Sequence, residues 1–301
     1  MATSGKPTVR EIDAKLARAL LPRRDERGDK WSHGCALLVA GSRGMCGAAS
    51  FAARAAFRCG LGYLKLAAPE SESAVLQILA PDAVLVACKG SDGRLALSDA
   101  PKILEAGARC AAWAAGPGIS AAPGTARLVR KLVRAMRAPG VLDADGLKAF
   151  AGRADLLARG NCGADLVLTP HAHEWELLFG APLPEDGPAR RRAVRERAVA
   201  LGQTLVAKGS ATIVAAPDGG LRVLDAPCSA LAKAGSGDAL AGAVLAFLAQ
   251  GLEPPEAAAL AVWLHNRAGH LGAKRFGEQG ILPRELPDLL GEAIVELGIR
   301  S

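Results

Sequence analysis

The sequence has 301 residues, half of them hydrophobic, with 35 glycines and a formal net charge of +7; this length allows one large α/β domain or two small ones. The densest basic run, residues 190–197, includes Glu196 and no interleaved aromatic residues, so a solvated helix face is favoured over a nucleic-acid-binding patch. The seven cysteines form no C-x-x-C pair, and no signal-peptide pattern opens the chain, so we expect reduced thiols in a cytoplasmic protein. The longest uncharged apolar segment, residues 239–252, is too short to span a bilayer, so we expect no membrane segment.

Strand and helix patterns alternate along the chain. A capping-box pattern at residues 8–11 predicts a first helix through Leu20. Strands are predicted at 35–40, 64–67, 83–87, 111–115, 141–143, 166–169 and 205–207, with a hairpin at 212–216 and 221–224. Helices are predicted at 49–59, 73–79, 125–136, 175–179, 239–252 and 257–271. This alternation predicts a parallel sheet covered by helices on both faces, as one domain.

Polar residues recur where the predicted strands end. The loops after the strands carry Ser42, Gly118, Asp145, His171, Glu174, Lys208 and Asp238. Because ligands bind at the carboxyl ends of strands in open α/β sheets, we expect these residues at one edge of the sheet. Each also has a structural alternative, such as a structural histidine with satisfied hydrogen bonds for His171, a first-turn acid for Glu174, or a helix cap for Asp143 and Asp145.

A turn of small residues, Ala-Gly-Ser-Gly-Asp at 234–238, opens the long apolar helical segment. Glycines let backbone N–H groups approach a ligand, and a helix start adds unpaired N–H groups and partial positive charge, which together suit a phosphate. A carboxylate at Asp238 is then best explained as the base that takes a proton from an attacking hydroxyl. The alternative is that Ser236 caps the helix and Asp238 complements the helix dipole.

Six segments, in this order, resemble the ribokinase-like superfamily and, within it, the nucleotide-dependent NAD(P)H-hydrate dehydratases. They are residues 40–48, 116–118, 143–145, 169–174, 208–212 and 231–242. The resemblance implies a three-layer α/β/α sandwich with a mostly parallel central sheet, as a single domain over residues 1–301 without an amino-terminal epimerase domain. It also implies a homo-oligomer, expected to be a tetramer, and a separate epimerase.

The same resemblance implies a lyase that repairs NADH or NADPH whose nicotinamide ring has been hydrated. ADP would phosphorylate the ring hydroxyl with the help of Mg²⁺, and loss of phosphate would restore the double bond and leave AMP. Carried over by motif, Asp238 is the catalytic base and also contacts substrate. Ala48, Gly118 and His171 would bind the hydrated dinucleotide, and Glu174 would lie near the metal through waters. The nucleotide-binding residues would be Lys208, Gly209, Ser210, Ala211, Thr212, Gly235, Ser236 and Gly237.

Two other functions share these motifs. A kinase of the same superfamily would use ATP on a hydroxymethylpyrimidine or thiazole alcohol and release a stable phosphorylated product. A nucleotide-sensing protein would bind without catalysis, which the retained Asp238 argues against. The chain also departs from the family pattern where Met45 and Cys46, Ser120, and Ala172 and His173 stand in substrate-facing loops.

Overall fold

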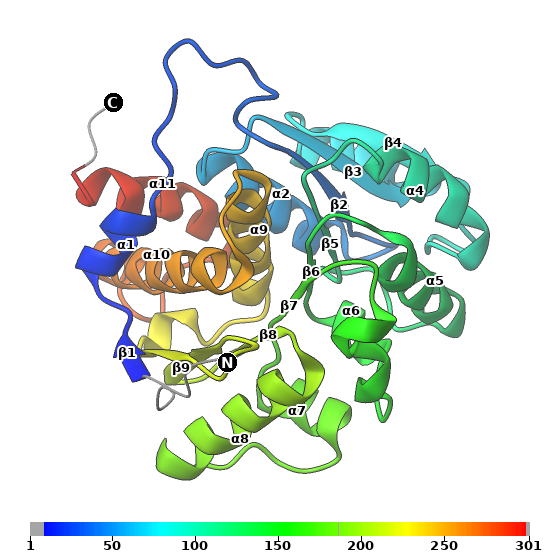
Figure 1. Cartoon of the computed structure of the whole chain (residues 1–301). Coiled ribbons are helices and arrows are strands. Elements are labelled where there is room, and N and C mark those ends of the chain that lie inside the picture. Colours follow the sequence, from blue (N-terminus) through cyan, green and yellow to red (C-terminus); the bar gives the residue numbers. More distant parts are fainter. Residues whose placement is uncertain (1–8, 186, 299–301) are drawn as a thin grey trace.

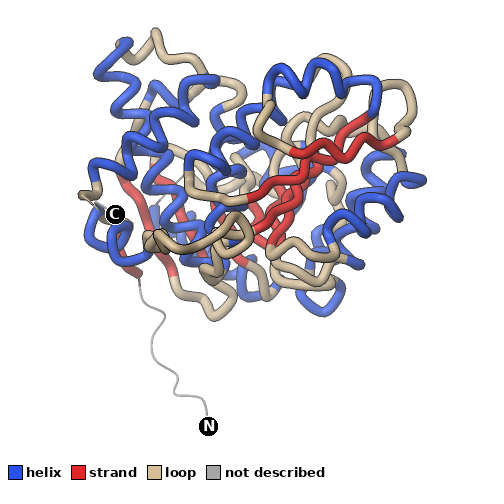
Figure 2. Tube along the Cα trace, turned by 90° about the horizontal axis from the view of Figure 1, so that it is seen from above, coloured by secondary structure: helices blue, strands red, loops and turns tan. Residues whose placement is uncertain are grey.

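The computed structural model describes residues 9–185 and 187–298, and these residues form one ten-stranded sheet with helices on both faces (Figures 1 and 2). The strand order is β1-β10-β9-β8-β7-β6-β5-β2-β3-β4. The strands are β1 (Val9–Glu11), β2 (Cys35–Val39), β3 (Tyr63–Pro69), β4 (Val84–Cys88), β5 (Ala112–Ala115), β6 (Gly140–Leu142), β7 (Leu166–Leu168), β8 (Thr204–Ala207), β9 (Ala211–Ala215) and β10 (Leu221–Asp225). All neighbouring pairs are parallel except those that β9 makes with β8 and β10, so the predicted mostly parallel sheet is confirmed.

Helices cover the sheet because its central strands are apolar on both sides, as in β2, β5 and β6, where every residue is buried. The α-helices are α1 (Ala14–Leu20), α2 (Cys46–Arg58), α3 (Ser73–Leu79), α4 (Ala100–Gly107), α5 (Pro123–Ala135), α6 (Asp145–Lys148), α7 (Ala172–Phe179), α8 (Gly187–Leu201), α9 (Ser236–Ala249), α10 (Pro254–Phe276) and α11 (Leu286–Glu296). Helices α2, α9 and α10 pack on one face, and α4, α5 and α8 on the other, which gives three layers (Figure 1).

Helix α9 is the central packing element of its face. Its residues from Ala239 to Ala249 are all buried, and it contacts α2, α10 and the strands β2, β5 and β6. Small residues allow this closeness: a Cβ on Gly242 would overlap the backbone carbonyl of Ala52 in α2. The helix that begins at the Gly-Ser-Gly-Asp turn is therefore closely packed from Ala239 to Ala249, while the turn itself stays partly exposed.

The chain start differs from the prediction. Residues Val9–Glu11 form β1, which pairs in parallel with β10, and the helix begins only after Asp13, whose side chain accepts the N–H of Leu16 at 2.7 Å. The predicted capping box was therefore wrong over residues 9–11, and Thr8 lies outside the described residues. A strand partner more than 200 residues away supplied the backbone hydrogen bonds that the local pattern assigned to a helix.

The strand order reverses between β5 and β2. From β2 the chain steps outward through β3 to β4, and it then returns to the other side of β2 to form β5. Loops after β2 and β5 diverge at such a reversal and leave a crevice where open α/β sheets bind ligands. None of the described helices is long and apolar enough to cross a lipid bilayer.

Candidate active site

A cavity of about 920 Å³ opens at the carboxyl edge of the sheet, over the ends of β6, β7 and β8 and the start of α9. Its outer wall comes from the segment between β10 and α9 and from α10. Residues of the predicted site that line it are His171, Glu174, Lys208, Gly209, Ser210, Thr212, Gly235, Ser236, Gly237 and Asp238. Four of the predicted strand-end residues, His171, Glu174, Lys208 and Asp238, thus meet here, whereas Ser42, Gly118 and Asp145 do not line this cavity.

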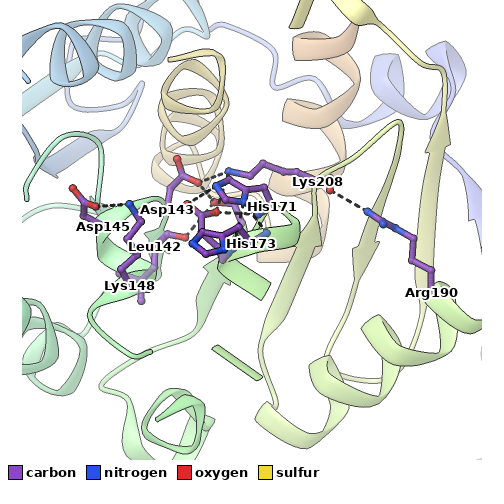
Figure 3. A network of polar contacts seen from close by, with 10 residues as sticks. Leu142, Asp143, Asp145, Lys148, His171, His173, Arg190 and Lys208 are labelled. Atoms are coloured by element: carbon purple, nitrogen blue, oxygen red, sulfur yellow. Dashed lines mark hydrogen bonds and ion pairs between the residues drawn. The ribbon is translucent and has the colours of Figure 1, made fainter. Parts of the chain in front are cut away.

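Lys208 is the centre of a charged cluster in this cavity (Figure 3). Its Nζ donates to Asp143 Oδ1 at 2.7 Å and lies 3.7 Å from Glu174 Oε2. Asp143 is 2% exposed and also accepts the hydroxyl of Thr169 at 2.6 Å. Burial alone would lower the pKa of Lys208, but the carboxylates of Asp143 and Glu174 outweigh it, so the pKa of the ammonium is raised. The cluster therefore holds one positive charge against two buried carboxylates.

Asp238 lies in the first turn of α9, directly after the glycine turn. Gly235 is the residue before the helix and has φ +98°, a conformation that favours glycine. Burial, and then the negative charge of Asp143, raise the pKa of Asp238 to about 7, although Lys208 opposes the shift. A carboxyl group with this pKa can accept a proton near neutral pH and is well suited to act as a general base.

His171 begins α7 and caps it. Its ring Nδ1 accepts the backbone N–H of His173 at 3.1 Å and that of Glu174 at 3.3 Å. The backbone N–H of His171 donates to Glu174 Oε2 at 2.9 Å. Burial lowers the pKa of His171 in spite of the nearby Glu174 carboxylate, so the ring is neutral at pH 7 with its proton on Nε2. The structural alternatives for His171 and Glu174 are thus realised as well: together they form a capping box.

The loop after β8 carries the predicted nucleotide residues 208–212. Gly209, Ser210 and Thr212 line the cavity, and the hydroxyl of Thr212 donates to the carbonyl of Gly209 at 3.3 Å. Ala211 is the first residue of β9 and is not among the lining residues. Its backbone N–H remains the group through which it could contact a ligand.

Ala48 and Gly118 lie in a different corner, at the reversal between β2 and β5. They contact each other, because a Cβ on Gly118 would come within 3.0 Å of the Ala48 Cβ and 2.6 Å of the Met45 carbonyl oxygen. The Ser42 hydroxyl donates to the Gly118 carbonyl at 2.8 Å, which ties the two loops together. Neither Ala48 nor Gly118 lines the charged cavity. The structure therefore brings the predicted dinucleotide residues together only in part, with His171 apart from the other two.

The loop after β5 ends at Ser120, which has φ +78° although it is not glycine. Its backbone N–H donates to Asp145 Oδ2 at 3.0 Å, and Asp145 Oδ1 accepts Lys148 Nζ at 2.9 Å. These contacts offset the cost of a left-handed conformation at a residue with a Cβ. Asp145 is thus a support for the crevice loop, and it does not line the charged cavity.

The sequence analysis assigned no site role to two residues of the cavity, Asp143 and His265. Asp143 was considered as a helix cap and as part of the family-like segment 143–145 but was given no site role, yet it is the main partner of Lys208. His265 of α10 carried no motif signal; its Nε2 lies 2.9 Å from the Ser236 carbonyl, and burial lowers its pKa to about 4. Because a carbonyl only accepts, the neutral ring carries its proton on Nε2 and anchors the glycine turn.

The residues present fit a magnesium ion held mainly by phosphates. Across residues 9–185 and 187–298, no three His, Cys, Asp or Glu side chains form a group that could hold a metal ion by themselves. Glu174 is 3% exposed, and its oxygens are committed to His171 and Lys208. Mg²⁺ commonly keeps several waters and binds through one or two carboxylates plus substrate phosphates, which agrees with a contact through water.

Comparisons with known proteins find a matching family model, a similar enzyme and a similar solved structure. A family model described as NAD(P)H-hydrate dehydratase matches residues 36–291. An ADP-dependent (S)-NAD(P)H-hydrate dehydratase of Bacillus subtilis is 34% identical over 273 residues, covering 91% of this chain and 93% of the relative. A crystal structure of the ADP/ATP-dependent enzyme from that organism, co-crystallised with ATP and Mg²⁺, superimposes with a TM-score of 0.81 at 30% identity, covering 98% of this chain and all of the other.

Longer relatives match as well. A bifunctional NAD(P)H-hydrate repair enzyme of Salinibacter ruber is 42% identical over 273 residues, which is 89% of this chain and 49% of the relative. The chain thus spans about half the length of these bifunctional relatives. A ribokinase-like superfamily protein of Enterococcus faecalis has a TM-score of 0.77 at 20% identity, covering 96% of each chain, and so supports the ribokinase-like fold alone.

Proposed function

This chain belongs to the NAD(P)H-hydrate dehydratase family, and from that premise we propose that it dehydrates hydrated NADH or NADPH with ADP as phosphoryl donor. The family and the ribokinase-like fold predicted from the motifs are confirmed. The products would be the repaired dinucleotide, AMP and phosphate. The matches support this dehydratase reaction rather than the vitamin-precursor kinase.

One observation supports the chemistry most directly: Asp238, with a pKa of about 7, follows the Gly-Ser-Gly turn at the start of α9. The turn offers backbone N–H groups and the positive end of the helix dipole to the phosphoryl group in transfer. The carboxylate next to it offers a proton acceptor. A phosphoryl acceptor hydroxyl needs both within reach, and phosphoryl transfer depends mainly on such positioning and charge stabilisation.

The proposed sequence begins when the Asp238 carboxylate takes the proton of the ring hydroxyl. The hydroxyl oxygen forms a bond to the β-phosphorus of ADP, and the bond between that phosphorus and the bridging oxygen breaks to release AMP. The phosphorylated ring then loses inorganic phosphate by cleavage of its C–O bond, together with the proton on the neighbouring carbon. The electron pair of the broken C–H bond forms the ring double bond, the electron pair of the C–O bond leaves with the phosphate, and the proton passes to solvent, so no oxidant is needed.

The residues around Asp238 have separate parts in this proposal. The Lys208–Thr212 loop borders ADP, with Lys208, Gly209, Ser210 and Thr212 lining the cavity. His171, through its protonated Nε2, donates to the hydrated dinucleotide, as do the loops at Ala48 and Gly118. Mg²⁺ would supply charge neutralisation between phosphates, near Glu174 and through waters. The likeness to an enzyme co-crystallised with ATP and Mg²⁺ supports this assignment of nucleotide and metal.

A coupled assay tests the function. Purified protein, hydrated NADH, ADP and Mg²⁺ are mixed, and the recovery of nicotinamide absorbance is followed with and without ADP. We expect ADP-dependent recovery and stoichiometric phosphate. Robust phosphorylation of a hydroxymethylpyrimidine or thiazole alcohol with ATP, without action on the hydrate, would assign the chain to the kinase alternative.

Other properties stay predictions from the resemblance. These are the single domain over residues 1–301, the tetramer and the separate epimerase; the cytoplasmic location stays a prediction from the cysteines and the absence of a signal-peptide pattern. Mass photometry of the purified protein tests the predicted tetramer directly.

A further inference from the structure

Arg190 of α8 lies behind the loop that follows β8. Its Nη2 donates to the backbone carbonyl of Lys208 at 3.0 Å (Figure 3). Lys208 is the residue whose ammonium bonds Asp143 in the cavity, and its backbone N–H donates to the Pro170 carbonyl at 3.0 Å. The backbone of Lys208 is therefore bonded on both sides: its N–H to the Pro170 carbonyl after β7, and its carbonyl to Arg190, which lies outside the cavity.

The guanidinium also lies directly against Gly209. A Cβ on Gly209 would come within 2.6 Å of Arg190 Nη2, a distance that real Cβ atoms do not show. Gly209 has no positive φ, so its backbone conformation does not by itself require glycine. The absent side chain at Gly209 is thus explained by the space that the guanidinium occupies.

Arg190 is partly buried, and among the described residues no carboxylate pairs with its charge. Its Nε is a buried donor without a hydrogen-bond partner within the described ranges. Burial lowers its pKa below the usual value. Holding a partly buried cation with an unpartnered Nε is unfavourable unless an anion binds nearby or its position serves another group.

Arg190 is not among the residues that line the cavity, so it acts through the loop. We propose that Arg190 is a positioning residue for the nucleotide: it fixes the Lys208–Gly209 peptide from behind and adds positive charge beside the nucleotide phosphates. The inference rests on the proposed function, because the loop is a nucleotide loop only if that function is right. It assigns to α8 a part in ADP binding that no motif indicated.

Arg195 provides a matched control on the same helix. Its Nε donates to the Gly219 carbonyl at 2.9 Å, so it too is an α8 arginine bound to one backbone carbonyl, but at the turn between β9 and β10. In Arg190→Ala we expect ADP–Mg²⁺ affinity, measured by calorimetry, to fall about tenfold, as loss of a hydrogen bond from a charged donor predicts. The KM for the hydrate should change less than twofold. Arg195→Ala should leave both values unchanged.

A double-mutant cycle tests the contact itself. Gly209→Ala should weaken ADP binding about tenfold in the parent, because the new Cβ displaces the guanidinium. In an Arg190→Ala background the same change should cost less than twofold, since the collision is gone. Gly124→Ala, at a helical glycine with open space around it, controls for the change of residue type.

The outcomes separate this inference from the proposed function. If the parent protein binds no ADP, the proposed function fails, and the inference fails with it. If the parent binds ADP but Arg190→Ala binds it equally well, or Gly209→Ala costs the same in both backgrounds, the inference alone is overturned. Should Arg190→Ala not fold, Arg190→Lys takes its place, because it keeps the charge without the planar pair of donors; weaker ADP binding is again expected.

Discussion

Two regions at the carboxyl edge of one sheet carry the proposed site, and they are built differently. The crevice at the strand-order reversal, between the loops after β2 and β5, contains Ala48 and Gly118 and is formed by close backbone contacts. The cavity after β6, β7 and β8 contains Asp143, Lys208 and Asp238 and is organised by charge. The same edge thus supplies shape in one place and electrostatics in the other.

The difference lies in what a substitution would disturb. In the crevice, a Cβ on Gly116 would overlap the Asp143 carbonyl oxygen, so volume is what the loop cannot accept. In the cavity, Asp143 and Glu174 are almost fully buried and depend on the one ammonium of Lys208. We therefore expect crevice variants to affect the hydrate and the fold, and cavity variants to affect the chemical step and its pH dependence.

The largest effect is expected for Asp238→Asn, which keeps the shape of the side chain and removes the proton acceptor. Loss of a general base typically lowers the rate by about 10²–10⁴. ADP should still bind at least as tightly as to the parent, because a negative charge near its phosphates is gone. Single-turnover kinetics and calorimetry measure the two quantities. A variant within threefold of the parent rate would reduce Asp238 to a helix-dipole residue.

The same variant makes a separate prediction about stability. The pKa of Asp238 is raised to about 7 in the folded protein, so its contribution to stability is fully present below the unfolded pKa and is lost as pH rises through 7. The unfolding free energy of Asp238→Asn relative to that of the parent should therefore rise from pH 4 to pH 8, and the variant should be more stable by at most about 4 kcal/mol at pH 8. Thermal unfolding at both pH values checks this, and a helix-cap role predicts a small loss instead.

Lys208→Met tests whether Asp143 and Glu174 depend on the Lys208 ammonium. Removing one partner of a buried ion pair costs about 3–5 kcal/mol of unfolding free energy. Because Lys208 lowers the pKa of Asp238, its loss should also move the acid limb of kcat/KM to higher pH, at about tenfold in rate per pKa unit. Lys65→Met is the control, since Lys65 is half-buried and bonds only the Ala106 carbonyl. An unmoved acid limb would contradict the electrostatic account.

Gly118→Ala probes the crevice. The residue has φ +63°, and its Cβ would lie 2.6 Å from the Met45 carbonyl oxygen, so we expect a loss of roughly 1–3 kcal/mol in unfolding free energy. The KM for the hydrate should rise while the dissociation constant of ADP stays within twofold. Gly124→Ala again serves as the control. An equal loss of ADP affinity would show that the two regions are not separate.

The smallest effect is expected for His171→Ala. It removes the cap of α7, worth about 1 kcal/mol, and a donor to the hydrated dinucleotide. The KM for the hydrate should rise about tenfold, as loss of one hydrogen bond predicts, with ADP binding unchanged. His171→Asn, which can still cap the helix, should recover the stability and not the KM. If ADP affinity fell and the hydrate KM did not, His171 would belong to the nucleotide side.

Much of the fold followed from local patterns. The predicted strand at 205–207 and the hairpin after it correspond to β8, β9 and β10, and the helix at 73–79 matches α3 residue for residue. Helix α2 begins three residues earlier than predicted, at Cys46, because the glycine loop closes sooner. Helices α4 and α11 were not assigned, and β1 was taken for a helix start. The features that the sequence did not predict were thus mainly element boundaries and strand pairings that depend on distant partners.

The residues of the site likewise divide into those that the sequence predicted and those that only the structure identified. The glycine turn and Asp238 were identifiable because their residue types are unusual at the start of an apolar helix. Asp143 was not, because its importance comes from Lys208, 65 residues later in the chain. His265 and Arg190 carried no signal at all, since each acts through one hydrogen bond to a backbone carbonyl of another segment.

By itself, the sequence determined the order of strands and helices and the residue types at the strand ends, because periodicity and glycine placement are local properties. Only the tertiary structure decided which strand-end residues face one another: Lys208 with Asp143 in the cavity, and Gly118 with Ala48 in the crevice. The tertiary structure also decided the ionisation of Asp238, since burial and the Asp143 charge raise its pKa to about 7. Charge interactions and steric contacts depend on distance in space, and that distance is set by the strand order and the packing of α9.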